Sequence, residues 1–384
     1  MVNLSAITQS KYYYSLLRVA IAGLSLTSFV ACTGPSDTAQ TSKDSSDDVA
    51  AAVSSPLTDK VALTGAGASF PSPLYQNWFI QLNKDIPELQ VNYQSVGSGA
   101  GIEQFTAKTV NFGASDVAMK DEEIEAVADG AILLPMTAGS IVLAYNLPDV
   151  KSGLKLPREV YVDILLGKIT KWNDDKIADA NPGITLPDTA ITVVHRSDGS
   201  GTTGVFTKHL SAISSEWEET IGEGKSVEWP TSGNFVGAKG SEGMTAQLQQ
   251  TEGAIGYVEF GFARNNKLAI AALENKAGKF IEPTPESASA TLDAIELPDN
   301  LRAFITDPEG DGSYPVVTYT WMLAYEKYED PQQAIAMELM IQNGLTKGQI
   351  VAEELGYVPL PQSVRERVAA AADVISPDYK ITLN

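Results

Sequence analysis

Residues 194–203, with the sequence VHRSDGSGTT, bring a cation, a carboxylate, two glycines and four hydroxyl groups together. A short β-branched run precedes them and apolar residues at helical spacing follow, so a helix is predicted to begin within the segment. The first N–H groups of a helix have no partner inside it and together carry roughly half a positive charge. Arg196 adds a permanent planar cation, and Asp198 is expected to hold it in place. These residue types predict a binding site for a small oxyanion.

Two further glycine-rich turns stand at predicted helix starts. Residues 61–71 (VALTGAGASFP) predict a short strand, a glycine turn and a helix, with Pro71 and Pro73 in its first turn. Residues 91–96 alternate like a strand, and the glycine-serine turn at 97–101 leads into a second helix. One such turn alone is most simply a tight connection between strand and helix. Three in one chain favour a shared anion site. A dinucleotide fingerprint is a weaker interpretation, because Phe70 stands where it needs a third glycine.

The elements that must position these turns indicate an α/β protein of two lobes. Residues 110–116 predict a strand that ends in Asp116, and two apolar runs, 140–146 and 316–323, predict buried strands that cross between lobes. Helices are predicted over residues 334–342 and 346–355. Strands that alternate with helices along the chain are typical of α/β architecture.

Composition excludes some classes of function. The chain has 384 residues, of which 43% are hydrophobic, and a net charge of −21 from 27 basic and 48 acidic residues. Length and composition are typical of two folded domains, and the strong acidity makes nucleic acid an unsuitable partner. An acidic protein that binds an anion must rely on short, directed hydrogen bonds, because its overall field repels the ligand.

The N-terminal region predicts export and a tether. Residues 1–31 have two basic residues before an apolar run too short to span a bilayer, which is typical of a signal peptide. Cys32, the sole cysteine, follows Phe-Val-Ala, which resembles the lipobox of bacterial lipoproteins and implies lipidation of Cys32. Ordinary signal-peptidase cleavage after Ala31 remains the alternative. Residues 32–60 are rich in Ser, Thr, Ala and Asp, and they predict a disordered tether to the membrane.

Enzymatic interpretations have weaker support. His195, Asp198 and Ser200 suggest a catalytic triad, but residues this close in one loop rarely converge as base, orienter and nucleophile. With only His195 and His209 as histidines and one cysteine, the sequence predicts no metal site and no cofactor. A pair of catalytic carboxylates stays possible among the acidic residues, although no pair stands out.

Five motifs in this order resemble the periplasmic phosphate-binding proteins of high-affinity phosphate ABC transporters. They are TGAGASFP at 64–71, GSGAG at 97–101, FGASD at 112–116, RSDGSGT at 196–202 and GAIGYVE at 253–259. The resemblance covers residues 61–375. It implies a two-lobed periplasmic-binding-protein clamshell of type II, with a β-sheet flanked by helices in each lobe and crossing strands between them. Lobe I would comprise residues 61–138 and 316–384, and lobe II residues 139–315.

The resemblance also implies which residues contact phosphate. Carried over motif by motif, they are Ser69, Phe70, Ser98, Asp116, Arg196, Ser200, Gly201 and Thr202, with Asp198 supporting Arg196. Three departures from the family pattern keep these contacts: Ser69 replaces a threonine, His195 stands where an arginine is common, and Gly99-Ala100 replaces a Ser-Gly pair.

Asp116 predicts selectivity for a protonated oxyanion. A carboxylate repels an anion unless the anion carries a proton to donate, and phosphate has such a proton at neutral pH whereas sulfate does not. The implied partners are inorganic phosphate and the membrane-bound permease subunits of an ABC transporter. The open alternatives are a phosphate scavenger or sensor without a transport role, and a binder of another tetrahedral oxyanion.

Overall fold

The computed structural model describes residues 56–383, and the predicted signal peptide, most of the predicted tether and Cys32 lie outside them. Lobe I denotes the predicted range 61–138 with 316–384, and lobe II the predicted range 139–315; this division stays a prediction. Besides part of β4 (Ile132–Tyr145), lobe I contains four strands and six helices: β1 Val61–Gly67, α1 Ser72–Asp85, β2 Leu89–Ser95, α2 Ser98–Thr106, β3 Phe112–Ser115, α3 Asp121–Glu125, β12 Val317–Ala324, α11 Pro331–Leu345, α12 Lys347–Leu355 and α13 Gln362–Ala372.

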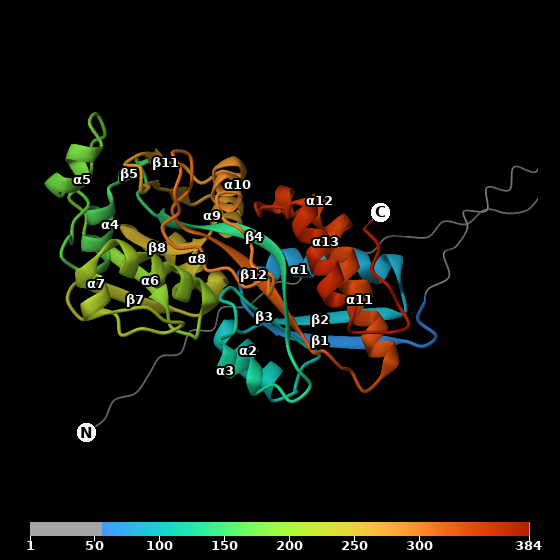
Figure 1. The fold of residues 1–384 in the computed structure, drawn as a ribbon. Helices are drawn as coiled ribbons and strands as arrows, with labels where there is room; N and C mark the ends of the chain where they lie inside the picture. Colours follow the sequence, from blue (N-terminus) through green and yellow to red (C-terminus); the bar gives the residue numbers. More distant parts are fainter. Residues whose placement is uncertain (1–55, 384) are drawn as a thin grey trace, which may run out of the picture. The chain divides into compact units, whose positions relative to one another are not determined.

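One long strand, β4 (Ile132–Tyr145), runs from lobe I into lobe II. Beyond it, lobe II contains shorter strands and seven helices among the described residues: β5 Lys155–Leu156, α4 Arg158–Leu165, α5 Asp175–Ala180, β6 Thr192–Arg196, α6 Gly201–Ile213, α7 Ser215–Thr220, β7 Asn234–Ala238, α8 Gly240–Gln250, β8 Ala254–Glu259, α9 Phe260–Asn265, β9 Ala269–Ile270, β10 Ala272–Glu274, β11 Phe280–Ile281 and α10 Pro285–Asp293. Helices α4 to α7 gather at one end of the sheet, and α1 and α11 to α13 at the other (Figure 1).

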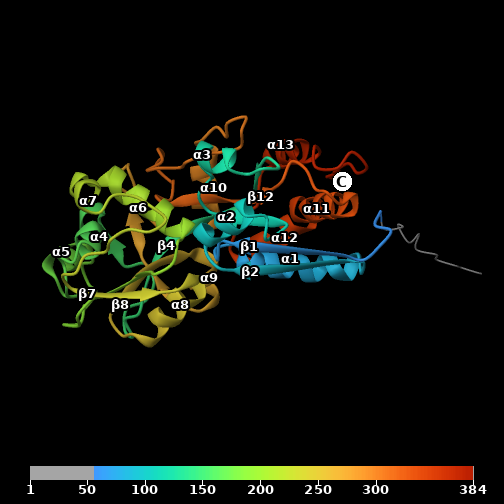
Figure 2. The same ribbon diagram turned by 90° about the horizontal axis from the view of Figure 1, so that it is seen from below.

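The main sheet has the strand order β2-β1-β3-β12-β4-β8-β6-β7, with β9 also paired to β4. Strand β4 changes partner in its middle. It pairs antiparallel with β12 through Ser140 and with β8 from Ile141 onward. The strands of the two lobes therefore form one continuous sheet that passes through β4. Strand β4 is labelled in Figures 1 and 2.

The sequence explains why β4 takes this position. All but the first of its residues are buried, as expected for an apolar strand covered on both faces. Strand β12, at the second predicted crossing run, is buried along its whole length. Val316, just before it, accepts a hydrogen bond from the Ile141 N–H at 2.9 Å, so the chain passes between the lobes at these two neighbouring points.

Two predicted boundaries shift in the structure. Strand β1 continues through Gly67, so the expected glycine turn at 65–67 is part of the strand. The reason is close packing: a Cβ on Gly65 would lie 2.1 Å from the Phe112 ring, and one on Gly67 2.1 Å from the Ala114 oxygen. The folded region also begins before Val61, because Leu57 is buried and the Thr58 N–H donates to Gln332 Oε1 at 2.8 Å.

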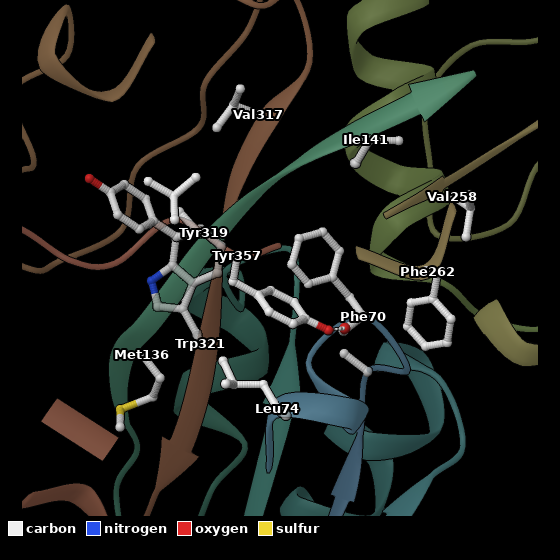
Figure 3. Packing of buried hydrophobic residues seen from close by; sticks show 14 of the residues in the cluster. Phe70, Leu74, Met136, Ile141, Val258, Phe262, Val317, Tyr319, Trp321 and Tyr357 are labelled. Atoms are coloured by element: carbon white, nitrogen blue, oxygen red, sulfur yellow. Dashed lines mark hydrogen bonds between the residues drawn. The ribbon is translucent and has the colours of Figure 1, made fainter. Parts of the chain in front are cut away.

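Aromatic residues fill the core beside the first turn of α1. Phe70 and Tyr357 have ring centroids 5.9 Å apart, and the Tyr357 hydroxyl donates to the Phe70 backbone oxygen at 2.7 Å (Figure 3). This hydrogen bond fixes the backbone of the turn before α1. Between residues 56 and 383, no helix combines the length and apolar character that crossing a membrane would need.

Candidate functional site

Arg196 is the last residue of β6, and the loop after it leads directly into α6. Ser200 is the N-cap of this helix, and its Oγ accepts from the Thr203 N–H at 3.1 Å. The Ser200 N–H itself donates to the Lys225 oxygen at 2.8 Å. The helix start is therefore held from both sides, and Gly201 and Thr202 occupy its first turn, where N–H groups lack intrahelical acceptors.

Arg196 and Asp198 form a bidentate ion pair. Arg196 Nε donates to Asp198 Oδ1 at 2.7 Å, and the second nitrogen donates to Oδ2 at 2.5 Å. The Arg196 side chain is only 2% exposed. Burial acts to raise the pKa of Asp198, but the hydrogen bonds and charge of Arg196 outweigh it and hold that pKa below its usual value. The predicted support of Arg196 by Asp198 is present in the structure.

Asp116 is a buried carboxylate surrounded by hydroxyl groups. Its Oδ1 accepts from Thr320 Oγ1 at 2.9 Å, and its Oδ2 from Thr202 Oγ1 at 3.1 Å. Burial raises the pKa of Asp116 to about 6, although the two threonine hydroxyls and the charge of Arg196 act in the opposite direction. The group is therefore ionised at pH 7 but accepts a proton in mildly acidic solution.

The loops of the two lobes touch each other at this point. The Gly99 N–H donates to the Gly199 oxygen at 2.9 Å. A Cβ on Gly201 would lie 2.5 Å from Ser98 Oγ and 2.8 Å from the Asp116 nitrogen, so these residues are in close contact. Ser98 Oγ also accepts from the Asp116 N–H at 3.3 Å.

Ser69 and Phe70 join the same group of residues through α8. Ser69 Oγ lies 2.9 Å from Ser241 Oγ and accepts from the Ser241 N–H at 3.0 Å. The neighbouring Gly240 N–H donates to Asp198 Oδ1 at 3.1 Å. Direct contacts thus link the turns before α1, α2, α6 and α8, and the structure brings all eight predicted residues and Asp198 into one region.

This arrangement suits a small oxyanion that still carries a proton. Hydroxyls and first-turn N–H groups of several helices supply donors, and a buried guanidinium supplies positive charge. Asp116 is the only carboxylate among the eight predicted contacts, and in its ionised form it can accept a ligand proton but cannot donate one. A bare, fully deprotonated anion would face an unprotonated buried carboxylate at neutral pH, which costs several kcal/mol.

Sequence reasoning missed three residues of this region. Ser241 follows Gly240 at the start of α8, so a fourth glycine-serine turn carried the same signal as the other three. Thr318 and Thr320 lie two residues apart in β12 and share one face of the strand, since side chains alternate. Thr318 Oγ1 donates to the backbone oxygen of Asp116 at 3.1 Å. These two threonines in the otherwise largely apolar strand β12 were the sequence signal that could have placed them at the site.

The histidines have structural partners of their own. His195 Nδ1 lies 3.0 Å from the Arg196 oxygen, and its ring stacks on Trp229. His209 is buried, and its Nε2 lies 2.8 Å from the Tyr161 hydroxyl. No group of three or more His, Cys, Asp or Glu within residues 56–383 is arranged to hold a metal ion.

Glu259 is a second buried carboxylate, at the point where β8 pairs with β4. It caps α9 by accepting from the Gly261 N–H at 2.7 Å and the Phe262 N–H at 3.1 Å. Burial raises its pKa to about 8, although both hydrogen bonds oppose the change. The native state thus keeps a proton that the unfolded chain releases, so this group lowers stability as the pH rises from about 4.5 to about 8.

Glu259→Gln is expected to remove that pH dependence. The substitution weakens the α9 cap at every pH, but the difference in Tm between variant and wild type should become more positive between pH 5 and pH 8, by at least about 2 °C. Thermal unfolding at a series of pH values measures this. Glu103→Gln, at an exposed helix position, is the matched control and should leave the slope unchanged. If Tm changed with pH in the same way in wild type and Glu259→Gln, Glu259 would not have the raised pKa that explains the pH dependence.

Comparisons with known proteins identify the family of the chain. Residues 35–342 match the family model described as a PBP superfamily domain. The PstS phosphate-binding protein of Pasteurella multocida is 45% identical over 82% of this chain and 90% of its own length. The PstS phosphate-binding protein of Methanocaldococcus jannaschii is 37% identical over 82% of this chain and 86% of its own length.

Solved structures show the same fold. A high-affinity periplasmic phosphate-binding protein, determined with bound phosphate, superposes with a TM-score of 0.68 at 20% identity and covers 84% of this chain and 96% of its own. The phosphate-binding protein of Stenotrophomonas maltophilia has a TM-score of 0.63 at 20% identity and covers 81% of this chain and 93% of its own. The predicted two-lobed clamshell fold is thus confirmed. The chain belongs to the PBP superfamily and, within it, to the family of PstS phosphate-binding proteins.

Proposed function

We propose that this protein binds inorganic phosphate between its lobes and delivers it to the membrane permease of an ABC transporter. The observation that carries the proposal is the buried carboxylate of Asp116 among oxyanion donors, because that combination favours an anion with a proton to donate. The names of the relatives and the phosphate held by a protein of the same fold support it.

The proposed phosphate contacts are the hydroxyls, backbone N–H groups and charged groups predicted from the sequence: Ser69, Phe70, Ser98, Asp116, Arg196, Ser200, Gly201 and Thr202. Asp198 holds Arg196 in place. A ligand that contacts both lobes stabilises only the arrangement in which the lobes meet. A partner that contacts both lobes can therefore distinguish the phosphate-bound protein, in which the lobes meet, from the free protein.

Export and membrane attachment belong to the same proposal. The N-terminal sequence supports export, and acylation of Cys32 would tether the protein to a membrane near its permease. The related proteins are named for binding rather than catalysis, which supports a role without an enzymatic step. Mass spectrometry of the mature N-terminus distinguishes an acylated Cys32 from a chain cleaved after Ala31.

Binding of phosphate, sulfate, molybdate and arsenate by isothermal titration calorimetry tests the proposal. One phosphate per chain should bind tightly, and sulfate should compete poorly at neutral pH. Phosphate uptake by cells that lack the gene then separates transport from scavenging or sensing. Restored uptake on reintroduction supports delivery to a permease, whereas binding without restored uptake favours the non-transport alternative.

Gly201→Ala is expected to weaken phosphate binding without unfolding the protein. The added Cβ would lie 2.5 Å from Ser98 Oγ across the lobe contact, so the lobes must separate slightly. Overpacking of this kind costs about 1–3 kcal/mol, which corresponds to a loss of about fivefold to 150-fold in affinity. Calorimetry and thermal unfolding measure the two effects.

Gly312→Ala is the matched control for that substitution, since a Cβ there would meet nothing within 4 Å. It should leave phosphate affinity unchanged. Equal affinities for Gly201→Ala and wild type would show that the contact between Gly201 and Ser98 does not accompany binding.

A further inference from the structure

An ion pair outside the predicted phosphate contacts connects the two lobes. Lys225, in the loop after α7, places its Nζ 2.6 Å from Glu123 Oε1 on α3. The predicted division assigns Lys225 to lobe II and Glu123 to lobe I. Neither residue is among the predicted phosphate contacts, so this pair is a separate link between the lobes.

The Glu123 carboxylate is held in place on its own helix. Its Oε2 accepts from the Lys120 N–H at 2.9 Å, which fixes the side chain across the first turn of α3. Burial acts to raise the pKa of Glu123, but the hydrogen bonds from Lys225 and from the Lys120 N–H outweigh it and hold that pKa below its usual value. Glu123 is therefore ionised at neutral pH and already oriented for Lys225.

Helix α3 is fastened to lobe I at its start. The Arg302 side chain donates to Asp121 Oδ1 at 2.6 Å and to the Met119 backbone oxygen at 3.2 Å. Residue 302 lies in the predicted range of lobe II, although the backbone oxygen of the preceding Leu301 accepts from Trp321 Nε1 of β12 at 2.8 Å. These contacts attach the segment around Arg302 to β12, so α3 rests on lobe I.

The loop that carries Lys225 is fastened to α6 in lobe II. The Lys225 backbone oxygen accepts from the Ser200 N–H at 2.8 Å. The preceding Gly224 N–H donates to Thr207 Oγ1 at 3.1 Å. Ser200 is the N-cap of α6 and a predicted phosphate contact. Lys225 therefore joins that contact to Glu123, through its backbone on one side and its side chain on the other.

Separation of the lobes would break this ion pair while each partner keeps its own support. The attraction between two unit charges falls with distance, and water and salt screen a pair that is pulled apart. The side chains of Lys225 and Glu123 are 28% and 29% exposed, so water screens them less than it screens a fully exposed surface pair, whose contribution is small. The pair therefore favours the arrangement in which the lobes meet.

We propose that Glu123 and Lys225 form an interlobe latch, a pair of positioning residues that retain phosphate in the closed protein without contacting it. The inference rests on the proposed function, because it requires that phosphate binds where the lobes meet. The two partners meet when the lobes have closed on the ligand. The latch therefore slows the release of phosphate more than it changes the rate of capture.

A double-mutant cycle in the full chain tests the latch. Glu123→Gln removes the charge but keeps an oxygen for the Lys120 N–H, and Lys225→Met keeps the backbone contact with Ser200. Each substitution is expected to weaken phosphate binding about threefold to tenfold. The double variant should lie within about twofold of the weaker single variant, because a pair that has lost one member has no second contribution to lose.

Kinetics and a conservative variant separate a latch from a general structural defect. Calorimetry gives the affinities, and rapid-mixing release of radiolabelled phosphate into excess unlabelled phosphate gives the dissociation rates. The loss of affinity should appear mainly as faster dissociation. Lys225→Arg keeps the charge and should stay within about twofold of wild type. The Tm of the phosphate-free protein should change by less than about 2 °C in the latch variants, whereas the rise in Tm caused by phosphate should shrink.

Glu122→Gln and Lys208→Met are the matched controls, since they remove the same charges near the same place. Glu122 is exposed on the same helix, and Lys208 pairs with Glu223 at 3.0 Å inside lobe II. Both controls should change phosphate affinity less than about twofold. Thermal unfolding identifies a variant that does not fold, and the other single variant then carries the comparison with its control.

The outcomes distinguish the latch from the proposed function. If phosphate binds but Glu123→Gln and Lys225→Met release it at the wild-type rate, the inference is wrong and the proposed function stands. The same conclusion follows if the effects of the two substitutions simply add, or if the controls lose as much affinity as the latch variants. If the wild-type protein does not bind phosphate, the proposed function itself fails.

Discussion

Arg196→Ala is expected to weaken phosphate binding by about 2–4 kcal/mol, or roughly 30-fold to 1000-fold. Arg196 is the buried cation of the site, and its side chain is 2% exposed. Without it, the phosphate charge loses its charge-assisted hydrogen bonds, and Asp198 remains as an unpaired carboxylate next to the anion. Isothermal titration calorimetry at pH 7 measures the loss directly.

Two controls separate the local role of Arg196 from its charge and from folding. Lys171→Ala removes one positive charge from an exposed ion pair with Asp188 and should leave phosphate affinity unchanged. Arg196→Lys keeps the charge but loses the bidentate geometry, so its affinity should lie between those of the wild type and Arg196→Ala. Thermal unfolding identifies a variant that fails to fold. A folded Arg196→Ala protein with wild-type affinity would exclude Arg196 from the site.

Asp116→Asn is expected to reduce the preference for phosphate over sulfate by at least about a hundredfold at pH 7. The ionised carboxylate accepts the phosphate proton and repels sulfate, whereas an asparagine amide can donate to either anion. The expected change therefore combines weaker phosphate binding with stronger sulfate binding. Calorimetric titration with each anion gives the ratio.

The wild-type protein should approach the same behaviour in acid. Because the pKa of Asp116 is raised to about 6, the protonated carboxyl can donate to sulfate below that pH. Sulfate affinity should rise as the pH falls through about 6 in the wild type and stay nearly flat in Asp116→Asn. Asp188→Asn, an exposed carboxylate, is the control. An unchanged selectivity ratio in Asp116→Asn would remove Asp116 from the role of proton acceptor.

The parts of the site that depend on neighbouring residues could be predicted from the sequence. Arg196 and Asp198 are two residues apart, and the start of α6 follows from its own glycine and hydroxyl residues. The strand β12 and the helices α11 and α12 also follow from local apolar patterns, although α11 begins at Pro331, three residues before the predicted helix. Such signals are local because helix starts and buried strands are decided within one turn or one run of residues.

The remaining parts depend on contacts that no local pattern contains. Ser69 meets Ser241 across 172 residues of sequence, and Thr320 meets Asp116 across 204. The resemblance to a known family predicted Ser69 and Asp116 as phosphate contacts, but it did not predict that they contact Ser241 and Thr320. The close approach of Gly201 to Ser98 and the ion pair of the interlobe latch likewise depend on how two lobes pack together.

A crystal structure of the protein with inorganic phosphate is the most direct test of the central claim, that the turns at the starts of α1, α2 and α6, together with Asp116 and one guanidinium, surround a single protonated oxyanion. The expected result is one phosphate within hydrogen-bond distance of Ser69, Ser98, Arg196 and Ser200, with one of its oxygens facing Asp116. Phosphate bound elsewhere, or no phosphate between the lobes at saturating concentration, would contradict it.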